Sequence, residues 1–342
     1  MDALLSEKSD LGDGLPVVQP TPARLNAFLE SNGLRGDESW GHVPPLDREA
    51  SASSVALCAL LAGCIPEHLG VVRACLRALE DPLLNARGVL TTTGSAALAV
   101  IVNGPIRNQL QFNADANCLG PGNCSNASVG RALSLVTRRI GGALSGQADM
   151  ATMGQPGKYT FCFAENQEVN PWTPLHVERG LAPGQSAVTV IGVSGTVEVA
   201  DMHAQSADEM IDVLGEAMSS PSAPFLGDEG LVGGGQPLVL LSPEWAATFA
   251  AAGLSKAELQ RRLHRRAECS LERLSPGFVR ALVARRRERL APTREALRVA
   301  DRPEDILIVV AGGAGIKQTF VPNWSGGSRA VTVAIETGSN VR

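Results

Sequence analysis

The chain has 342 residues, a formal net charge of -5 at pH 7 and 44% hydrophobic residues, which is enough for one large core or two smaller ones. The acidic balance and an aromatic content of only 4% argue against a general polyanion binder, so neither nucleic acid nor a membrane is the expected partner. The first residues lack the basic end and the apolar run of a signal peptide, and we expect a cytoplasmic protein.

The N-terminal part of the chain is predicted to be an arm, followed by two helices. Residues 1–50 are rich in Pro, Gly and Asp and contain one expected helix at residues 21–32. A helix at residues 51–62 ends at Gly63, and a second helix begins at Pro66.

Strand-like runs then alternate with helices. Strands are expected at residues 89–94, 99–104, 159–166, 187–193, 237–243, 306–313 and 330–335, and helices after Asn126, at 208–218 and from 243.

This alternation predicts an α/β fold, a sheet with helices on both faces that binds its ligands at the strand ends. The order helix, strand, turn and helix occurs at residues 75–110 and again at 213–249. We therefore consider two similar α/β halves around a shared cleft, a first half at residues 51–180 and a second at 181–342. The glycine-bearing run at residues 227–235 is interpreted as a mobile loop or lid.

A loop rich in asparagine and glycine is the first candidate site. Residues 103–126 hold six asparagines, and Gly120-Pro121-Gly122 leads into a helix that Ser125 or Asn126 can cap. Backbone N–H groups at such a helix start favour an anion. The alternative is an ordinary connection between a strand and a helix. The substrate-binding candidates here are Asn103, Asn117, Asn123 and Ser125.

Cys64 is the leading candidate nucleophile. It lies between Gly63 and the first turn of the next helix, where the helix dipole favours a thiolate and lowers the pKa. His68 is a candidate partner or base. The alternative is a buried structural cysteine.

Residues 150–179 concentrate polar side chains on irregular backbone. On an alternating strand from residue 158, Lys158 and Cys162 share a face, and Lys158 and Tyr159 are candidate substrate-binding residues. Cys162 is a second candidate catalytic thiol. The alternative is a solvated loop.

Four further candidates complete the set. Glu165 and His176 are candidate acid–base groups, Arg179 is a candidate carboxylate clamp, and Lys317 follows late glycines that indicate a second anion-binding strand end.

Two other clusters of chemically active side chains have more than one explanation. Cys118 and Cys124, together with Cys64 and Cys162, offer four thiolates for a zinc, iron–sulfur or redox site, although their spacing is wide and we assign no metal ligand. The sequence leaves open whether Cys118 and Cys124 bind a metal or form a disulfide. The arginine-rich residues 261–298 are better explained as a solvated helical face or a subunit contact than as a nucleic-acid groove, because acids alternate with the bases. No nucleotide fingerprint is present, and no cofactor is assigned.

Several longer motifs carry a resemblance. The segments AGCIPEH, VNGPIRNQL, LGPGN-SNAS-GRAL, DMATMGQPGKYTFCFAEN, PWTPLHVERG and RPEDILIVVAGGAG resemble a bacterial family of unassigned function with the annotation UGSC-type (seleno)protein. The resemblance runs from about residue 15 to 335, and the family name implies a thiol or selenol role. The chain departs from the family in lacking a Cys-Gly-Ser-Cys segment, in reading Ile316-Lys317-Gln318 after the late glycines where Lys-His is expected, and in having Cys118 and Cys124 at non-cysteine positions.

Taken together, the residues predict a cysteine-dependent enzyme that acts on a small anionic or acyl substrate through a thiolate, as a lyase, transferase or hydrolase. A thiol-redox or metal protein is one alternative, and a non-catalytic small-molecule-binding subunit is another. We expect a small-molecule substrate and a homo-oligomer.

Overall fold

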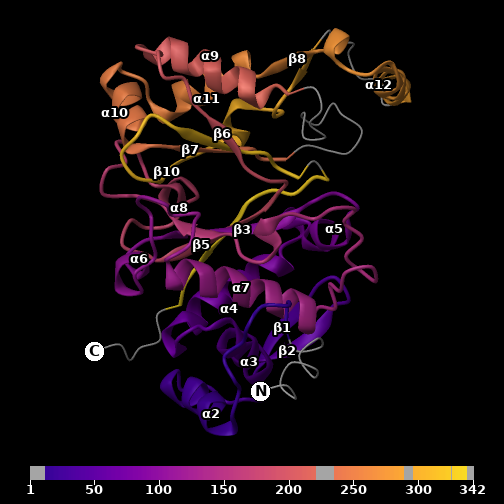
Figure 1. Cartoon of the computed structure of the whole chain (residues 1–342), viewed down its shortest axis with the longest axis vertical. Coiled ribbons are helices and arrows are strands. Elements are labelled where there is room, and N and C mark those ends of the chain that lie inside the picture. Colours follow the sequence, from indigo (N-terminus) through magenta and orange to yellow (C-terminus); the bar gives the residue numbers. More distant parts are fainter. Residues whose placement is uncertain (1–11, 221–234, 289–295, 325, 337–342) are drawn as a thin grey trace. The chain divides into compact units, whose positions relative to one another are not determined.

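The computed structural model describes residues 12–220, 235–288, 296–324 and 326–336, and its helices surround sheets of two to four strands in the expected α/β class (Figure 1). The chain divides into two compact units. The first unit comprises residues 1–164, 176–191 and 330–342, and the second comprises residues 165–175 and 192–329. The units therefore interleave along the chain, whereas the expected halves met at residue 180.

The first unit contains two sheets and most of the helices. Its helices are α2 (Pro22–Ser31), α3 (Ala52–Ala62), α4 (Leu69–Glu80), α5 (Ala86–Thr91), α6 (Ile106–Gln109), α7 (Cys124–Arg139) and all of α8 (Leu175–Glu178) except its first residue, with 3-10 turns η2 (Pro66–His68), η3 (Pro82–Leu84) and η4 (Pro156–Lys158). Its strands are β1 (Ser39–Val43), β2 (Arg48–Ser51), β3 (Ala97–Asn103), β4 (Cys162–Ala164), β5 (Ala187–Val193) and β12 (Val331–Ala334).

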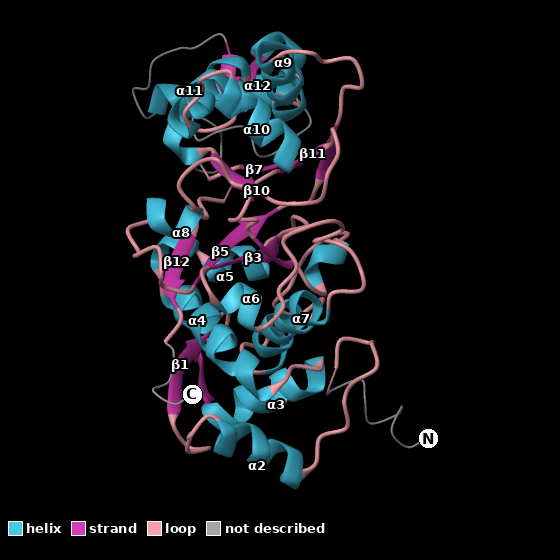
Figure 2. Cartoon of the chain, turned by 90° about the vertical axis from the view of Figure 1, so that its left-hand side faces the viewer, coloured by secondary structure: helices cyan, strands magenta, loops and turns pink. Residues whose placement is uncertain are grey.

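The main sheet of this unit has the strand order β12-β5-β3-β4. Strand β4 runs parallel to β3, with Val100 opposite Cys162, and β12 runs antiparallel to β5. Strand β3 is an apolar run that is almost wholly buried, as a central strand requires. Helices α4 and α7 pack on this sheet and on each other (Figures 1 and 2). The segment after α7, which carries the candidate site, therefore lies beside β3.

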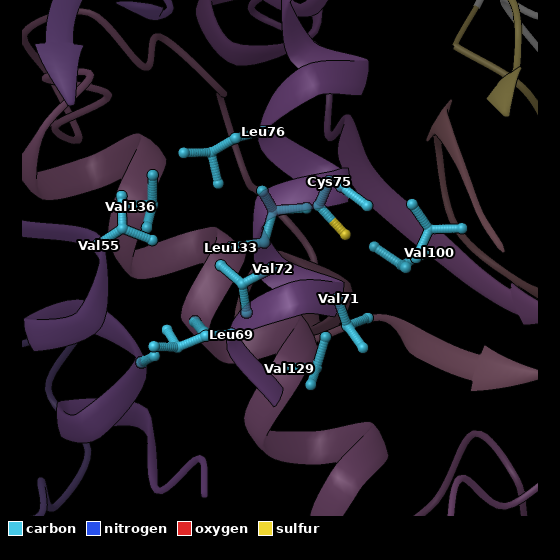
Figure 3. Packing of buried hydrophobic residues seen from close by; sticks show 14 of the residues in the cluster. Val55, Leu69, Val71, Val72, Cys75, Leu76, Val100, Val129, Leu133 and Val136 are labelled. Carbon is cyan, nitrogen blue, oxygen red and sulfur yellow. The ribbon is translucent and has the colours of Figure 1, made fainter. Parts of the chain in front are cut away.

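The core of the first unit forms where α3, α4 and α7 meet the sheet (Figure 3). Leu69, Val72 and Leu76 of α4 lie against Leu133 and Val136 of α7, and all of these side chains are buried. Burying one such side chain contributes about 1.5–3 kcal/mol. The core fixes α7 firmly and with it the loops at both of its ends.

The described residues of the N-terminal segment, 12–50, contribute side chains to this core, whereas the sequence predicted an arm. Helix α2 forms as expected, with Thr21 accepting from the Arg24 N–H and Pro22 in the first turn. Strands β1 and β2 form an antiparallel hairpin that the sequence analysis did not predict. Phe28 and Trp40 are buried against the α3 and α4 side chains.

The helix boundaries at the corner between α3 and α4 lie where the sequence predicted them. Ser51 and Ser54 form a capping box at the start of α3, and Gly63 ends the helix with a φ of 91°. Pro66 then opens η2, which leads directly into α4. By contrast, residues 89–94 were predicted as a strand, and this is wrong because Ala86–Thr91 form α5, whose start is capped by the Asn85 side chain accepting from the Gly88 N–H.

The second unit is built around a sheet of order β10-β7-β11-β6, in which β10 is parallel to β7 and β11 is antiparallel to both of its neighbours. Among the described residues, no helix is both long and apolar enough to span a bilayer. The elements of this unit are β6 (Val197–Val199), α9 (Ala207–Met218), β7 (Leu238–Leu241), α10 (Pro243–Ala251), α11 (Lys256–Arg266), β8 (Glu268–Ser270), η5 (Leu271–Arg273), α12 (Pro276–Glu288), β9 (Ala296–Arg298), η6 (Pro303–Asp305), β10 (Leu307–Val310) and β11 (Gln318–Val321).

The arginines of α11 form exposed ion pairs with acids of α9. Arg262 lies 2.5 Å from Asp208, and Arg266 lies 2.7 Å from Asp212. This arrangement agrees with a solvated helical face. The side chains of residues 285–288 and almost all of the glycine-bearing run at 227–235 lie outside the described residues.

Candidate functional site

A cavity of about 530 Å³ lies in the first unit, between α7, the start of β3 and the chain from residue 143 to 159. This size falls in the usual range for small-molecule sites, roughly 300–1,000 Å³. Its apolar wall includes Leu98, Leu133 and Met153. The polar side chains that line it are Asp13, Ser134, Thr137, Arg138, Ser145, Asp149, Gln155, Lys158 and Tyr159.

The backbone that carries Lys158 is tied to α7 and β3 by side-chain hydrogen bonds. Ser134 of α7 donates to the Lys158 carbonyl at 2.6 Å, and Gln155 donates to the Ser95 carbonyl at 2.8 Å. Thr160 donates to the Ala127 carbonyl at 3.0 Å. The chain approaches α7 this closely because position 130 is glycine: a Cβ there would lie 2.3 Å from Thr160 Oγ1. Lys158 is therefore held in a defined position on the cavity wall.

Lys158 and Asp149 form an ion pair in this wall, with Nζ 2.7 Å from Oδ2. Only 25% of the Lys158 side chain and 13% of the Asp149 side chain are exposed. Asp149 lies at the end of a tight turn in which its own N–H donates to the Leu144 carbonyl at 3.0 Å. A half-buried pair of this kind places a proton donor and an acceptor beside the cavity.

Asp13 contributes a second paired charge to the cavity. Its carboxylate accepts from Arg131 at 2.7 and 2.8 Å. Burial acts to raise the pKa of Asp13, but hydrogen bonds from Arg131 and from the Leu15 N–H outweigh it and hold the pKa below its usual value. The cavity thus combines a polar wall of both signs with an apolar wall.

The sequence prediction for residues 158–164 is only partly correct. Lys158 and Tyr159 do line one cavity. However, Lys158 ends η4 instead of beginning a strand, and β4 starts at Cys162, whose side chain belongs to the hydrophobic core. Lys158 and Cys162 therefore do not share a strand face.

The asparagine-rich loop is held together by its own carboxamides. Asn123 donates to the Asn117 carbonyl at 3.1 Å, and Asn117 donates to the Pro121 carbonyl at 2.9 Å. Asn126 accepts from the Asn113 N–H and donates to the carbonyls of Asn113 and Cys118. These contacts support the alternative interpretation, a structured connection.

Two further details of this loop differ from the prediction. Asn103 is fully buried at the end of β3. The N-cap of α7 is Asn123, so Ser125 and Asn126 lie inside the helix instead of capping it. The Asn123 side chain makes no cap hydrogen bond to α7.

His68 forms a structural hydrogen-bond chain with Ser125. The Ile65 N–H donates to His68 Nδ1 at 3.3 Å, which leaves the ring proton on Nε2, 3.1 Å from Ser125 Oγ. Ser125 in turn donates to the Leu110 carbonyl at 2.5 Å. Burial lowers the pKa of His68 to about 4. Both ring nitrogens of His68 and the Ser125 hydroxyl are therefore engaged in this hydrogen-bond chain.

Cys64 does not have the lowered pKa that its position predicted. Its side chain is 6% exposed and belongs to the same hydrophobic core as Cys75 and Cys162. Burial raises the pKa of all three thiols, for Cys75 to about 12. The correction has a clear cause: desolvation in the core outweighs the helix dipole.

The described residues do not bring the cysteines together as a four-thiolate metal site would require. All seven cysteines lie within the described residues and are free thiols. Nowhere in the described part of the chain do three or more His, Cys, Asp or Glu side chains come together as a metal site would require. Cys118 is buried, whereas Cys124 is exposed at the first position of α7, with its sulfur 3.7 Å from Ser128 Oγ.

The other candidate residues have structural partners. Glu165 is fully buried and accepts from Asn170 at 2.7 Å and from the Leu175 N–H at 2.9 Å, so it organises the following loop. His176 is fully buried in the first unit, and burial lowers its pKa while a backbone hydrogen bond involving Pro183 opposes this shift.

The two cationic candidates also lie away from the cavity. Arg179 donates to the Ala330 carbonyl, and Lys317 of the second unit pairs with Glu198 at 2.6 Å. Neither residue lines the cavity that holds Lys158 and Tyr159.

The chain matches no known protein family, no curated protein and no solved structure. The resemblance to the UGSC-type family therefore stays a prediction that rests on the motifs quoted above.

Sequence reasoning missed Asp149, Asp13 and Arg138 as cavity residues. Asp149 directly precedes the polar segment at 150–179 that the sequence singled out, and its carboxylate accepts from Lys158 Nζ at 2.8 Å. The sequence signal that could have identified Asp149 is its position nine residues before Lys158 on irregular backbone. Asp13 and Arg138 are brought to the cavity by tertiary packing, which leaves no local pattern.

Proposed function

We propose that the first unit binds a small anionic molecule in the cavity of about 530 Å³, with Lys158 as the residue that contacts its charged group. The observation that carries the proposal is the Lys158–Asp149 pair, half-buried in the cavity wall. A lysine in this setting offers a positive charge and three N–H donors, while Asp149 holds it in place. Tyr159, Ser134 and Gln155 add polar groups around it.

The same ion pair also supports the proposal that the protein is an enzyme. Lys158 would transfer a proton to or from the bound molecule, and Asp149 would hold Lys158 in position. General acid–base catalysis requires a titratable group beside the ligand, and Lys158 is such a group. The buried thiols are poorer candidates, because burial disfavours the thiolate that a nucleophile needs. A non-catalytic binder would use the same cavity without turnover.

A thermal-shift panel of small carboxylates and phosphates tests the proposal. At least one member should raise the Tm of the wild-type protein, and Lys158→Met should abolish this rise. Lys317→Met is the matched control, because Lys317 also pairs with an acid but lies in the second unit. Equal stabilisation of the wild type and Lys158→Met by every ligand that binds would contradict the proposal.

Thiol chemistry at Cys124 is the second candidate function. Cys124 is exposed at the first position of a 16-residue helix whose N-cap side chain makes no hydrogen bond to it. The N-terminal end of a helix favours a thiolate. A Cys124→Ser variant that loses a thiol-dependent activity retained by Cys118→Ser would support this function.

Two proposals from the sequence have no bearing on this site. We propose that the protein is a homo-oligomer, with the arginine-rich residues 261–298 as a candidate subunit contact, and that it works in the cytoplasm. Light scattering of the purified protein, coupled to size-exclusion chromatography, tests the oligomer. A mass equal to one chain of 35.7 kDa would contradict it.

A further inference from the structure

A second pocket of about 340 Å³ adjoins the cavity and shares Arg138 and Ser145 with it. Three arginines, Arg48, Arg138 and Arg139, line this pocket together with polar side chains such as Gln147, and no acidic residue lines it. The protein as a whole carries a charge of -5, so this pocket is a local concentration of the opposite sign. We call it the arginine pocket.

The three arginines come from two elements that are docked together. Arg138 and Arg139 end α7, whereas Arg48 begins β2 of the N-terminal hairpin. The hairpin contacts the end of α7 through the Leu46 N–H, which donates to the Gly141 carbonyl at 3.1 Å. A Cβ on Gly142 would lie 2.5 Å from Leu46 and 3.8 Å from the guanidinium carbon of Arg48. Glycine at position 142 thus leaves room for the Leu46 side chain, and the Arg48 guanidinium lies close to the same position at the end of α7.

Helix stability explains only part of this cluster. Arginines in the last turn complement the negative end of the helix dipole, which accounts for Arg138 and Arg139. Two of the last four carbonyls of α7 already have backbone donors, because Val136 accepts from Ile140 and Gly141 and Thr137 accepts from Ala143. A third arginine from another element is therefore not required to cap the helix.

The neighbouring acid does not neutralise Arg48. Asp47 pairs with Arg87 at 2.8 Å instead. Arg138 donates through Nε to the Gly12 carbonyl, a neutral partner. Three positive charges around one pocket repel each other, and a bound anion removes this repulsion. The planar guanidinium groups match the oxygens of a phosphate, which carries about 1.5 to 2 negative charges at pH 7.

We propose that the arginine pocket binds the phosphate group of a ligand whose remaining part occupies the cavity beside Lys158. This inference rests on the proposed function and names its substrate class as a small phosphorylated molecule. Arg138 and Ser145 line both pockets, so the two lie next to each other and the proposed ligand would extend from one to the other past these residues. With the phosphate in the arginine pocket, Lys158 contacts a second charged group of the same molecule, as the proposed function requires.

Titration with inorganic phosphate at constant ionic strength tests the arginine pocket by itself. Phosphate should bind the wild type, and Arg48→Gln should weaken binding about tenfold or more, because it removes a charge-assisted hydrogen-bond donor. Arg48 is exposed and does not line the cavity, so this variant should fold. Arg35→Gln is the control, since Arg35 is an exposed arginine paired with Asp37 elsewhere in the first unit. Undetectable phosphate binding, or equal weakening by Arg48→Gln and Arg35→Gln, would overturn the inference.

Two results distinguish a failure of the arginine-pocket proposal from a failure of the proposed function at Lys158. A ligand that depends on Lys158, carries no phosphate and binds Arg48→Gln as tightly as the wild type would overturn the arginine pocket alone. Phosphate binding that depends on Arg48, without any ligand that depends on Lys158, would support the arginine pocket and contradict the proposed function.

Discussion

Lys158 Nζ lies 2.7 Å from Asp149 Oδ2, and both side chains line the cavity of about 530 Å³ in the first unit. The pair is neither fully exposed nor fully buried. Its free-energy contribution therefore lies between that of a surface pair, about 0–1 kcal/mol, and the cost of breaking a fully buried pair, about 3–5 kcal/mol. Because part of each side chain is exposed, the pair stays accessible to a ligand.

Removing the carboxylate should leave Lys158 without its partner. We expect Asp149→Asn to lower the free energy of unfolding by about 1–2 kcal/mol and to weaken ligand binding, because the lysine is no longer held in place. Urea denaturation measures the first effect. The double variant with Lys158→Met should cost less than the sum of the two single variants. Strictly additive costs would show that the pair is not coupled.

Gly130→Ala should disturb the cavity from the opposite wall. Alanine in a helix usually stabilises it relative to glycine, but here the new methyl group would lie 2.3 Å from Thr160 Oγ1 and 3.0 Å from the Phe161 backbone nitrogen. We expect a net loss of about 1–3 kcal/mol and weaker binding, because residues 156–161 must move away from α7. Gly184→Ala is the control, with no atom within 4 Å of its Cβ. A stabilised Gly130→Ala protein would contradict this packing.

Much of the fold was predictable because local patterns determine it. The caps of α2 and α3 and the apolar runs of β3, β5 and β10 lie where the sequence placed them. Residues 89–94 were misassigned because three β-branched threonines favour a strand, whereas the Asn85 cap and tertiary packing select a helix. The β1–β2 hairpin was missed because it is fixed by contact with α4 and the end of α7.

The candidate site was predicted less well, for a physical reason. Lys158 and Tyr159 were identified by type and by their irregular backbone, but the sequence could not show that Cys64 and His68 are desolvated. Burial is a property of the assembled core, and it reverses the effect that a helix start has on a thiol. The asparagines suggested a binding site in the sequence. In the structure, their carboxamides hydrogen-bond to carbonyls of the same loop and hold it closed.

Alkylation of native protein should modify Cys124 before the other cysteines. Cys124 is exposed, whereas the other six thiols are buried, and burial raises the pKa of Cys58 to about 11 and that of Cys75 to about 12. A thiol with a pKa this high forms almost no thiolate at neutral pH. Iodoacetamide labelling followed by peptide mapping measures the order of reaction.

Two comparisons control this experiment. Unfolded protein should label all seven cysteines at similar rates, and Cys124→Ser should leave almost no rapid labelling in the native state. Rapid labelling of native Cys64 would show that its corner opens to solvent, and it would restore Cys64 as a candidate nucleophile.

His68 should make the protein less stable as the pH falls. Its pKa is lowered to about 4 in the folded protein, against an ordinary value of 6.5, because burial disfavours the charged ring. Above about pH 6.5 the ring is neutral in both states, so its full contribution is present. Between pH 6.5 and 4 the unfolded state takes up the proton first, and on the order of 3 kcal/mol of stability is lost.

Urea denaturation across this pH range, compared between the wild type and His68→Gln, isolates the effect. The variant should be less stable at pH 7, because the bonds to Ile65 and Ser125 are disturbed, but its stability should fall less steeply on acidification. Identical pH slopes for the two proteins would rule out His68 as the titrating group.

The most direct test of a ligand site at Lys158 is the binding of a ligand from the carboxylate and phosphate panel to three proteins: wild type, Lys158→Met and Lys317→Met. Calorimetry should show a ligand that binds the wild type and Lys317→Met with equal affinity and that loses at least about tenfold in affinity for Lys158→Met, as expected for a lost charge-assisted hydrogen bond. If the ligands that bind the wild type all bind Lys158→Met with unchanged affinity, the cavity beside Lys158 and Asp149 is not their site.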